Sequence, residues 1–154
     1  MSTPSAVPAA IDALVALFAA TLGAERVFDG PGARDTGEGS YVFVGVGDPD
    51  DDGYDDSASG DQSWAWLGHV QRDETFSVHC CVIAWNGDGD QKAARDEAFA
   101  IVGKVTDALQ ADPTLGGVLL YAPGVKSYGL RQIQDGSGAA TKLPFDVECR
   151  ARLS

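Results

Sequence analysis

Two stretches of the chain repeat apolar residues at every third or fourth position, which is the spacing of one side of an α-helix. The first covers residues 9 to about 22, with Pro8 suited to its first turn and Gly23 directly after its end. Its apolar stripe consists of Ile11, Leu14, Val15, Phe18 and Leu22. We expect a helix of the mature protein here, packed along that stripe.

The second periodic stretch covers residues 90 to about 110 and follows the turn sequence Asn86-Gly87-Asp88-Gly89. Either Asp88 or Asp90 can cap its N-terminus, and Pro113 sets its end. Its buried stripe consists of Ala94, Ala98, Val102, Val105 and Leu109. The acidic residues before this helix are therefore better explained as a turn and a cap than as a ligand site.

β-Branched and aromatic residues gather in short runs that predict strands. The run 75–85 is apolar on one face and partly covered on the other, so we expect it in the centre of a sheet. The run 143–153 alternates strictly, which predicts one dry face and one face in water or against another subunit. The remaining expected strands are 26–28, 41–46, 64–71, 118–121 and 125–133.

The order of these elements predicts the fold class. A helix, a group of strands, a second helix and a further group of strands favour an α+β domain: a largely antiparallel β-sheet with two α-helices packed on one face. Residues 47–63, with seven aspartates among glycine and serine, are too polar for a core element and are expected to form a loop. We expect one domain over residues 1–154.

The net charge of −12 is spread unevenly along the chain. Residues 1–61 hold 12 acids and 2 bases, residues 62–112 hold 8 and 4, and residues 113–154 hold 3 and 5. An acidic front and a mildly basic tail can attract each other between subunits. Such a chain is not expected to bind nucleic acid tightly, because the phosphate backbone must be neutralised by lysine and arginine.

Neither a membrane span nor a secretion signal is expected. No apolar run approaches the roughly 18 residues of a spanning helix, and the apolar N-terminal stretch is interrupted by Asp12. The expected location is a bacterial-type cytoplasm or an assembly built there. Three cysteines, of which Cys80 and Cys81 are neighbours on a strand, argue against a disulfide framework or a shared metal. We interpret them as buried, reduced thiols.

The sequence contains no recognised catalytic pattern. His69 and His79 lie on expected strands without a recognised serine or cysteine elbow, and no phosphate-binding glycine loop occurs. Alternation places His79 and Cys80 on opposite faces of their strand. No nucleophile, base and orienting group can be assembled from the sequence, so an enzyme is not expected and no cofactor is implied.

The sharpest local motif is Asp48-Pro49-Asp50-Asp51-Asp52-Gly53, which matches the first half of a calcium-binding loop. Its weak candidate ligands are Asp48, Asp50, Asp52 and Asp56. Position 12 of such a loop, which needs a bidentate glutamate, is Ser59, and a strand precedes the loop where a helix should. A solvated acidic loop is the favoured interpretation, and a calcium-binding module remains the alternative of another class. Trp64 and Trp66, on one strand face, suit core packing or a subunit contact.

With these elements in order, the chain resembles the tail terminator proteins of siphophages, of the type found in phages of actinobacteria. The segments that carry the resemblance are Ile11-Asp12-Ala13-Leu14, Val27-Phe28-Asp29-Gly30-Pro31, Val44-Gly45-Val46-Gly47-Asp48, Arg72-Asp73-Glu74-Thr75-Phe76-Ser77-Val78, Ala84-Trp85-Asn86-Gly87-Asp88, Arg95-Asp96-Glu97-Ala98-Phe99, Asp112-Pro113-Thr114-Leu115-Gly116-Gly117 and Phe145-Asp146-Val147. Each is weak alone, and their order along most of the chain is the evidence.

The resemblance implies a homo-oligomeric ring, usually a hexamer, in the neck of the virion. It caps the tail tube protein and joins it to the head–tail connector, and DNA passes through without tight binding. Another neck component, such as a connector or head-completion protein, is a close alternative. The candidate subunit-interface residues are Asp146, Glu148, Arg150, Arg152, Lys126 and Arg131. The candidates for an acidic lumen that repels DNA are Asp48, Asp50, Asp51, Asp52, Asp55 and Asp56.

Overall fold

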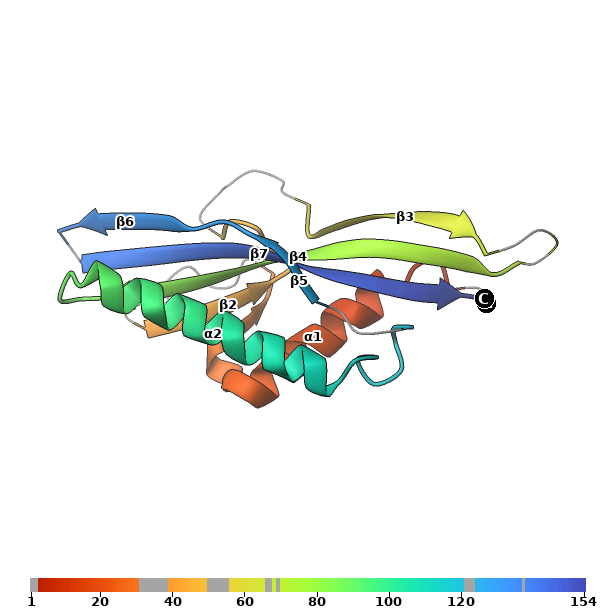
Figure 1. The fold of residues 1–154 in the computed structure, drawn as a ribbon, viewed down its shortest axis with the longest axis horizontal. Helices are drawn as coiled ribbons and strands as arrows, with labels where there is room; N and C mark the ends of the chain where they lie inside the picture. The colour runs from red at the N-terminus through yellow and green to blue at the C-terminus, as the bar shows by residue number, and fades with distance from the viewer. Residues whose placement is uncertain are drawn as a thin grey trace.

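A computed structural model of the chain describes residues 3–30, 39–49, 56–65, 68, 70–120, 124–136 and 138–154 (Figure 1). Its helices are α1 (Val7–Leu22), a 3-10 turn (Ala24–Arg26) and α2 (Gln91–Ala111). Its strands are β1 (Val27–Asp29), β2 (Gly39–Val44), β3 (Ala58–Trp64), β4 (Arg72–Asn86), β5 (Gly124–Tyr128), β6 (Arg131–Asp135) and β7 (Gly138–Leu153).

The sheet is built on the long antiparallel pair β4–β7, which stays in register from Arg72 opposite Leu153 to Asn86 opposite Ala139. Shorter strands flank this pair. β3 and β2 pair in succession along the free edge of β4, and β5 and β6 pair along the free edge of β7. β1 adds to β2 in parallel. The expected position of the 75–85 strand, in the centre of the sheet, is confirmed.

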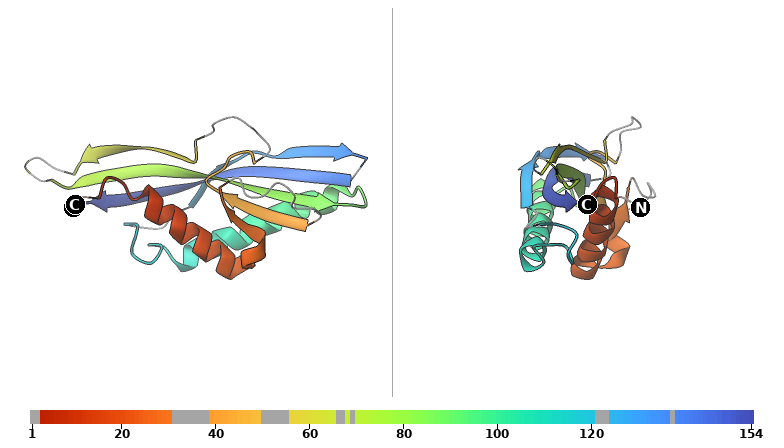
Figure 2. Two further views of the ribbon diagram at one scale, coloured as in Figure 1. Left: turned by 180° about the vertical axis from the view of Figure 1, so that it is seen from behind. Right: turned by 90° about the vertical axis from the view of Figure 1, so that its right-hand side faces the viewer.

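Both helices lie on the same side of the sheet, below it in Figure 1 and in both views of Figure 2. Their buried stripes are Ala10, Leu14 and Phe18 of α1 and Ala94, Ala98, Ile101, Val105 and Leu109 of α2. They pack against alternate residues of β4 and β7, among them Val78, Val82 and Val147. Burial of each large side chain stabilises the fold by roughly 1.5–3 kcal/mol. The predicted α+β class with both helices on one face is confirmed.

A smaller apolar cluster lies on the opposite side of the sheet. It consists of Phe43, Val46, Cys81 and Ile83, with Phe28, Tyr41 and Trp85 packed around them. Phe28 stacks on Phe43 with ring centroids 5.2 Å apart. Where β4 pairs with β2, its second face is therefore buried as well. The sequence predicted this, because residues 75–85 carry apolar side chains on both faces.

The start of α1 is held by a residue far away in sequence, Glu74 of β4. Ala6, at the N-cap position, supplies no side-chain cap. Instead the buried Glu74 carboxylate accepts hydrogen bonds from the Ala6 N–H at 2.7 Å, from Ser5 Oγ at 2.8 Å and from Gln62 Nε2 at 2.7 Å. A negative charge at this position also favours the positive end of the helix dipole. One carboxylate thus fixes α1 to β3 and β4.

The second helix is capped locally. The Asp90 side chain accepts a hydrogen bond from the Ala93 N–H at 3.0 Å, so of the two predicted caps Asp90 is the one used. The neighbouring turn is closed by Asn86 Oδ1, which accepts from the N–H groups of Asp88 and Asp90. The interpretation of this acidic segment as turn and cap is confirmed.

Two strand predictions around the acidic segment were wrong. Residues 58–63, expected in a loop, belong to β3, an edge strand whose side chains are almost all exposed and therefore show no apolar pattern. The expected strand 64–71 contributes only Trp64 to β3, and the Ala65 N–H donates to Gln71 O at 3.0 Å across the hairpin turn. Trp66 and His69 lie outside the described residues.

The region after α2 also differs from its prediction. Residues 118–120 are turn and bend instead of strand, because Leu119 N–H donates back to Thr114 O and three preceding residues, Leu115 to Gly117, have positive φ. The segment 125–133, expected as a single strand, forms two strands, β5 and β6. Gly129 and Leu130 separate them and belong to neither strand. Among the described residues, no helix is long and apolar enough to cross a membrane.

Candidate interaction surface

The side of the sheet away from the helices carries a row of polar side chains over β3, β4 and β7, continued by Lys126 of β5. This polar face consists of Ser59, Asp61, Thr75, Ser77, His79, Lys126, Asp146, Glu148, Arg150 and Arg152. It arises because residues of the opposite parity, such as Phe76 and Val147, point into the helix-covered core. Polar and apolar alternation in β4 and β7 thus separates a core from a hydrophilic surface.

His79 and Asp146 form the closest contact on the polar face. They lie directly opposite each other in the β4–β7 ladder, with His79 Nδ1 2.6 Å from Asp146 Oδ1. Ser127 Oγ of β5 donates to the other carboxylate oxygen at 3.0 Å. Both side chains are only partly exposed. These hydrogen bonds connect β4, β7 and β5 on the side of the sheet away from the helices.

Ser59 of β3 completes a serine, histidine and aspartate set, because its Oγ lies 3.4 Å from His79 Nε2. The expectation that no such set can be assembled was therefore wrong. The backbone N–H of Ser59 takes part in the β3–β4 ladder. His79 N–H donates to Ser57 O, and bonded pairs alternate along an antiparallel ladder, so the N–H of Ser59 points to Ser77 of β4. That N–H is therefore not free to bind an oxyanion of a substrate, and the three side chains link β3, β4 and β7.

Two ion pairs extend the polar face toward its ends. Lys126 Nζ lies 3.6 Å from Glu148 Oε2, and Arg152 makes two contacts with Asp73, at 2.8 and 3.2 Å. The hydrogen bond from Arg152 holds the pKa of Asp73 below its ordinary value of 3.8, and the pKa of Arg152 is raised in turn. The Lys126–Glu148 pair is exposed on both sides, and such pairs contribute little to stability, so it remains available for exchange with a partner.

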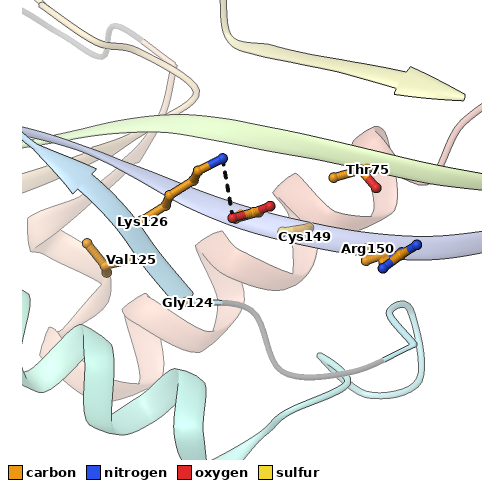
Figure 3. Close-up of a pocket in the computed structure, with 7 residues that line it drawn as sticks. Thr75, Gly124, Val125, Lys126, Cys149 and Arg150 are labelled. Atoms are coloured by element: carbon orange, nitrogen blue, oxygen red, sulfur yellow. Dashed lines mark ion pairs between the residues drawn. The ribbon is translucent and has the colours of Figure 1, made fainter.

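Two shallow hollows of about 350 and 420 Å³ meet on this surface at Thr75, Lys126 and Glu148. Figure 3 shows the first hollow, where β5 begins at Gly124 beside β7 and Arg150 points along β7 away from the Lys126–Glu148 ion pair. The hollows are open, and polar and apolar groups both line them. Their shape suits contact with another macromolecule better than enclosure of a small ligand.

The predicted interface residues are divided between two places. Asp146, Glu148, Arg150, Arg152 and Lys126 all lie on the polar face. Arg131 lies on β6 and, with Lys142 of β7, contacts Asp48 at 3.1 and 3.2 Å. These two ion pairs hold the start of the aspartate-rich segment against β6 and β7.

Of the aspartates predicted as calcium ligands or lumen residues, only Asp48 and Asp56 lie within the described part of the chain. Asp50, Asp51, Asp52 and Asp55, which both the calcium and the lumen predictions include, lie outside it. Among the described residues, no three histidine, cysteine or acidic side chains are grouped so that they could hold a metal ion. Both predictions for this segment stay predictions, with Asp48 held by cations of the protein itself.

All three cysteines are buried and free, as predicted. Burial raises the pKa of Cys81 and of Cys149 to about 12, and it raises that of Cys80 further still. A thiol with so high a pKa stays protonated near neutral pH and is a poor nucleophile. The cysteines are therefore part of the packing.

Sequence reasoning missed several contacts of this surface. Ser59, Ser127 and His79 were not connected with Asp146, and Glu74 was not recognised as the residue that holds α1. Alternation does predict that His79 and Asp146 lie on polar faces of their strands. It cannot predict that the two strands pair in the register that brings them together, across 67 residues of sequence.

Comparison with known proteins gives one line of information, the fold. No protein-family model matches the sequence, and no curated protein matches it significantly. Among solved structures, a chain of the "Virion of native gene transfer agent (GTA) particle" has a similar fold, with a TM-score of 0.58 and 16% sequence identity. The similarity covers 97% of this chain and 99% of that one. The two chains therefore share their architecture from end to end.

Proposed function

We propose that this protein is a structural subunit of a phage-type virion: a tail terminator that closes into a ring, usually a hexamer in the family it resembles. The ring caps the tail tube and joins it to the head connector at the top of the tail. The observation that carries the proposal is the fold shared over nearly the full length of both chains with a subunit of a gene transfer agent virion. The ordered set of sequence segments described above supports the same assignment.

The polar face supports a role in assembly. Its Lys126–Glu148 ion pair is exposed and weak, so a neighbouring subunit can replace one partner at little cost. A head-to-tail contact that closes on itself generates a ring, and the acidic front and basic tail of the chain provide charges of opposite sign for such a contact. The net charge of −12 suits a lumen through which DNA slides without binding.

The test is the size and shape of the purified protein. Light scattering should give the mass of a closed multimer, and negative-stain images should show rings with a central hole about as wide as duplex DNA. Arg150→Glu, which reverses a charge on the polar face, should weaken the ring. Lys104→Glu is the matched control, because Lys104 is an exposed cation on α2 away from that face. A strict monomer at high concentration would refute the proposal.

Another neck component, a head–tail connector or head-completion protein, is the close alternative, since it would have similar size, acidity and fold. The two roles differ in what they bind. A terminator should co-purify with tail tubes that lack heads, and a head-completion protein with filled heads that lack tails. Binding to heads alone would assign the alternative.

Two functions of other classes can be tested directly. A calcium-binding module based on Asp48 and Asp56 should release or absorb heat with calcium and gain thermal stability, and we expect neither effect because Asp48 is paired with Arg131 and Lys142. A hydrolase based on Ser59 and His79 should be labelled at Ser59 by a fluorophosphonate. We expect no labelling above that of a Ser59→Ala control.

A further inference from the structure

Asn86 is the only asparagine of the chain, and Gly87 follows it directly. The side-chain amide of an asparagine can be attacked by the backbone nitrogen of the next residue, and glycine, which has no side chain, hinders this attack least. Asn86 ends β4, and the turn after it leads to α2 at the end of the sheet away from the C-terminus (Figure 1). Gly87 is exposed to water. The two reacting groups and the solvent are therefore present at this turn.

The turn holds the Asn86 side chain by its oxygen. Oδ1 accepts hydrogen bonds from the N–H groups of Asp88 at 3.0 Å and Asp90 at 3.2 Å. The backbone oxygen of Asn86 accepts from the Gly89 N–H at 3.2 Å, and a Cβ added to Gly138 would lie only 2.4 Å from it. The side chain and the backbone of Asn86 are therefore both fixed in one conformation.

This conformation keeps the reacting atoms apart. Asn86 lies opposite Ala139 in the β4–β7 ladder, and a residue in an antiparallel strand has a ψ of about +135°. Ring closure requires ψ of Asn86 to rotate until the nitrogen of Gly87 approaches the side-chain carbon Cγ. That rotation would disrupt the pairing with Ala139 and draw Oδ1 away from its two donors. The folded turn is therefore unreactive, and an opened turn is not.

We propose that Asn86 is a modification site that the native turn keeps closed, and that it loses its side-chain amide by deamidation when the turn opens. The nitrogen of Gly87 forms a bond with Cγ of Asn86 and gives up its proton. The side-chain nitrogen takes a proton and leaves as ammonia, which produces a succinimide ring. Water then opens the ring. A water molecule is consumed, ammonia is released, and no group is oxidised or reduced.

The two ways of opening the ring have different consequences. If water breaks the bond between Cγ and the Gly87 nitrogen, residue 86 becomes an aspartate, whose carboxylate can accept from the same two N–H groups. Its negative charge lies near the start of α2, where the helix dipole favours it. If water breaks the backbone bond, the chain passes through the former side chain as isoaspartate and is longer by a carbon atom. The end of β4 and the turn to α2 then lose their geometry.

The experiment follows the mass of the protein at mildly alkaline pH, and peptide mapping assigns any change to residue 86. Conversion in buffer should be slower than in guanidinium chloride by roughly tenfold to a hundredfold, because two hydrogen bonds must break together before the ring can close. Gly87→Ala should slow conversion in guanidinium chloride, because a methyl group hinders the attack. Gly87 is not among the glycines with positive φ, so alanine fits the backbone.

Two results of this experiment would overturn the proposal. If residue 86 is not converted in guanidinium chloride, it is not a modification site. If the rates in buffer and in guanidinium chloride are equal, the native turn does not keep the site closed. An Asn86→Asp variant, which reproduces one product, should keep the melting temperature of the wild type, whereas the isoaspartate fraction should melt lower. An equal melting temperature for both products would show that the turn geometry does not matter.

A pair of glycine variants tests whether the turn itself closes the site. Gly138→Ala places a methyl group against Asn86 O and should speed conversion in buffer by roughly tenfold, whereas Gly103→Ala, in open space on α2, should not speed it. Hydrogen exchange of the wild type is the second measurement if Gly138→Ala does not fold. The Asp88 and Asp90 amides should be protected by about the same factor as Asn86. Unprotected amides beside a slowly converting Asn86 would refute the proposal.

Discussion

Replacement of Glu74 tests how α1 is held on the sheet. In Glu74→Ala, three donors lose their acceptor. Ser5 Oγ and Gln62 Nε2 are near the surface and can turn to water, whereas the Ala6 N–H is buried and cannot. A buried donor left unpaired costs about 1–3 kcal/mol, and loss of a charge-assisted bond at a helix start raises the total to roughly 3 kcal/mol.

Glu74→Gln retains the shape and one acceptor oxygen, but it turns an amide N–H₂ toward a donor. We expect it to lose about half as much stability, roughly 1–1.5 kcal/mol. Glu148→Ala is the matched control: it removes a carboxylate of the same type on the same sheet, in an exposed ion pair, and should cost less than about 1 kcal/mol.

The assay is urea unfolding followed by circular dichroism. With a slope of about 2 kcal/mol per molar urea, Glu74→Ala should lower the midpoint by about 1.5 M. Limited proteolysis should detect earlier cleavage within α1 in this variant. If Glu74→Ala and Glu148→Ala shift the midpoint equally, the carboxylate does not hold the helix and the reasoning is refuted.

Three further predictions concern charge, backbone and thiols. Arg152 lowers the pKa of Asp73 in the folded state, so the stabilisation by this pair is present at neutral pH and is lost as pH falls below about 3.8 toward the folded pKa. The urea midpoints of wild type and Asp73→Asn should therefore converge at low pH. Gly138→Ala should destabilise the folded protein by more than about 2 kcal/mol, because φ is +131° and the new Cβ would lie 2.4 Å from Asn86 O. Gly103→Ala, in open space on α2, should stabilise it by about 0.5–1 kcal/mol. Equal shifts of the melting temperature in the two variants would contradict this reasoning. The three buried cysteines should not react with Ellman's reagent in the native protein and should all react in denaturant, and rapid native labelling would show that the core is open.

The sequence by itself determined the elements whose pattern is strong and local. The two amphipathic helices, an aspartate cap on α2, the central strand β4 and the alternation of β7 were all predictable, because each depends on residues within a few positions of one another. Which of Asp88 and Asp90 forms the cap was decided by the structure. The assignment of both helices to one face followed from the order of elements. The weak patterns failed: β3 has no apolar stripe because it is an exposed edge, and the apolar residues 118–120 are held in a turn by their own backbone.

Only the tertiary structure decided which polar residues meet. The contacts of Glu74 with Ala6, His79 with Asp146, and Asp48 with Lys142 join positions 67 to 94 residues apart. Their geometry depends on the register of strand pairs, and a shift of one residue would move each side chain to the other face of the sheet. The local sequence pattern determines which segments form helices and strands, whereas the packing of segments distant in sequence determines which side chains meet on the surface.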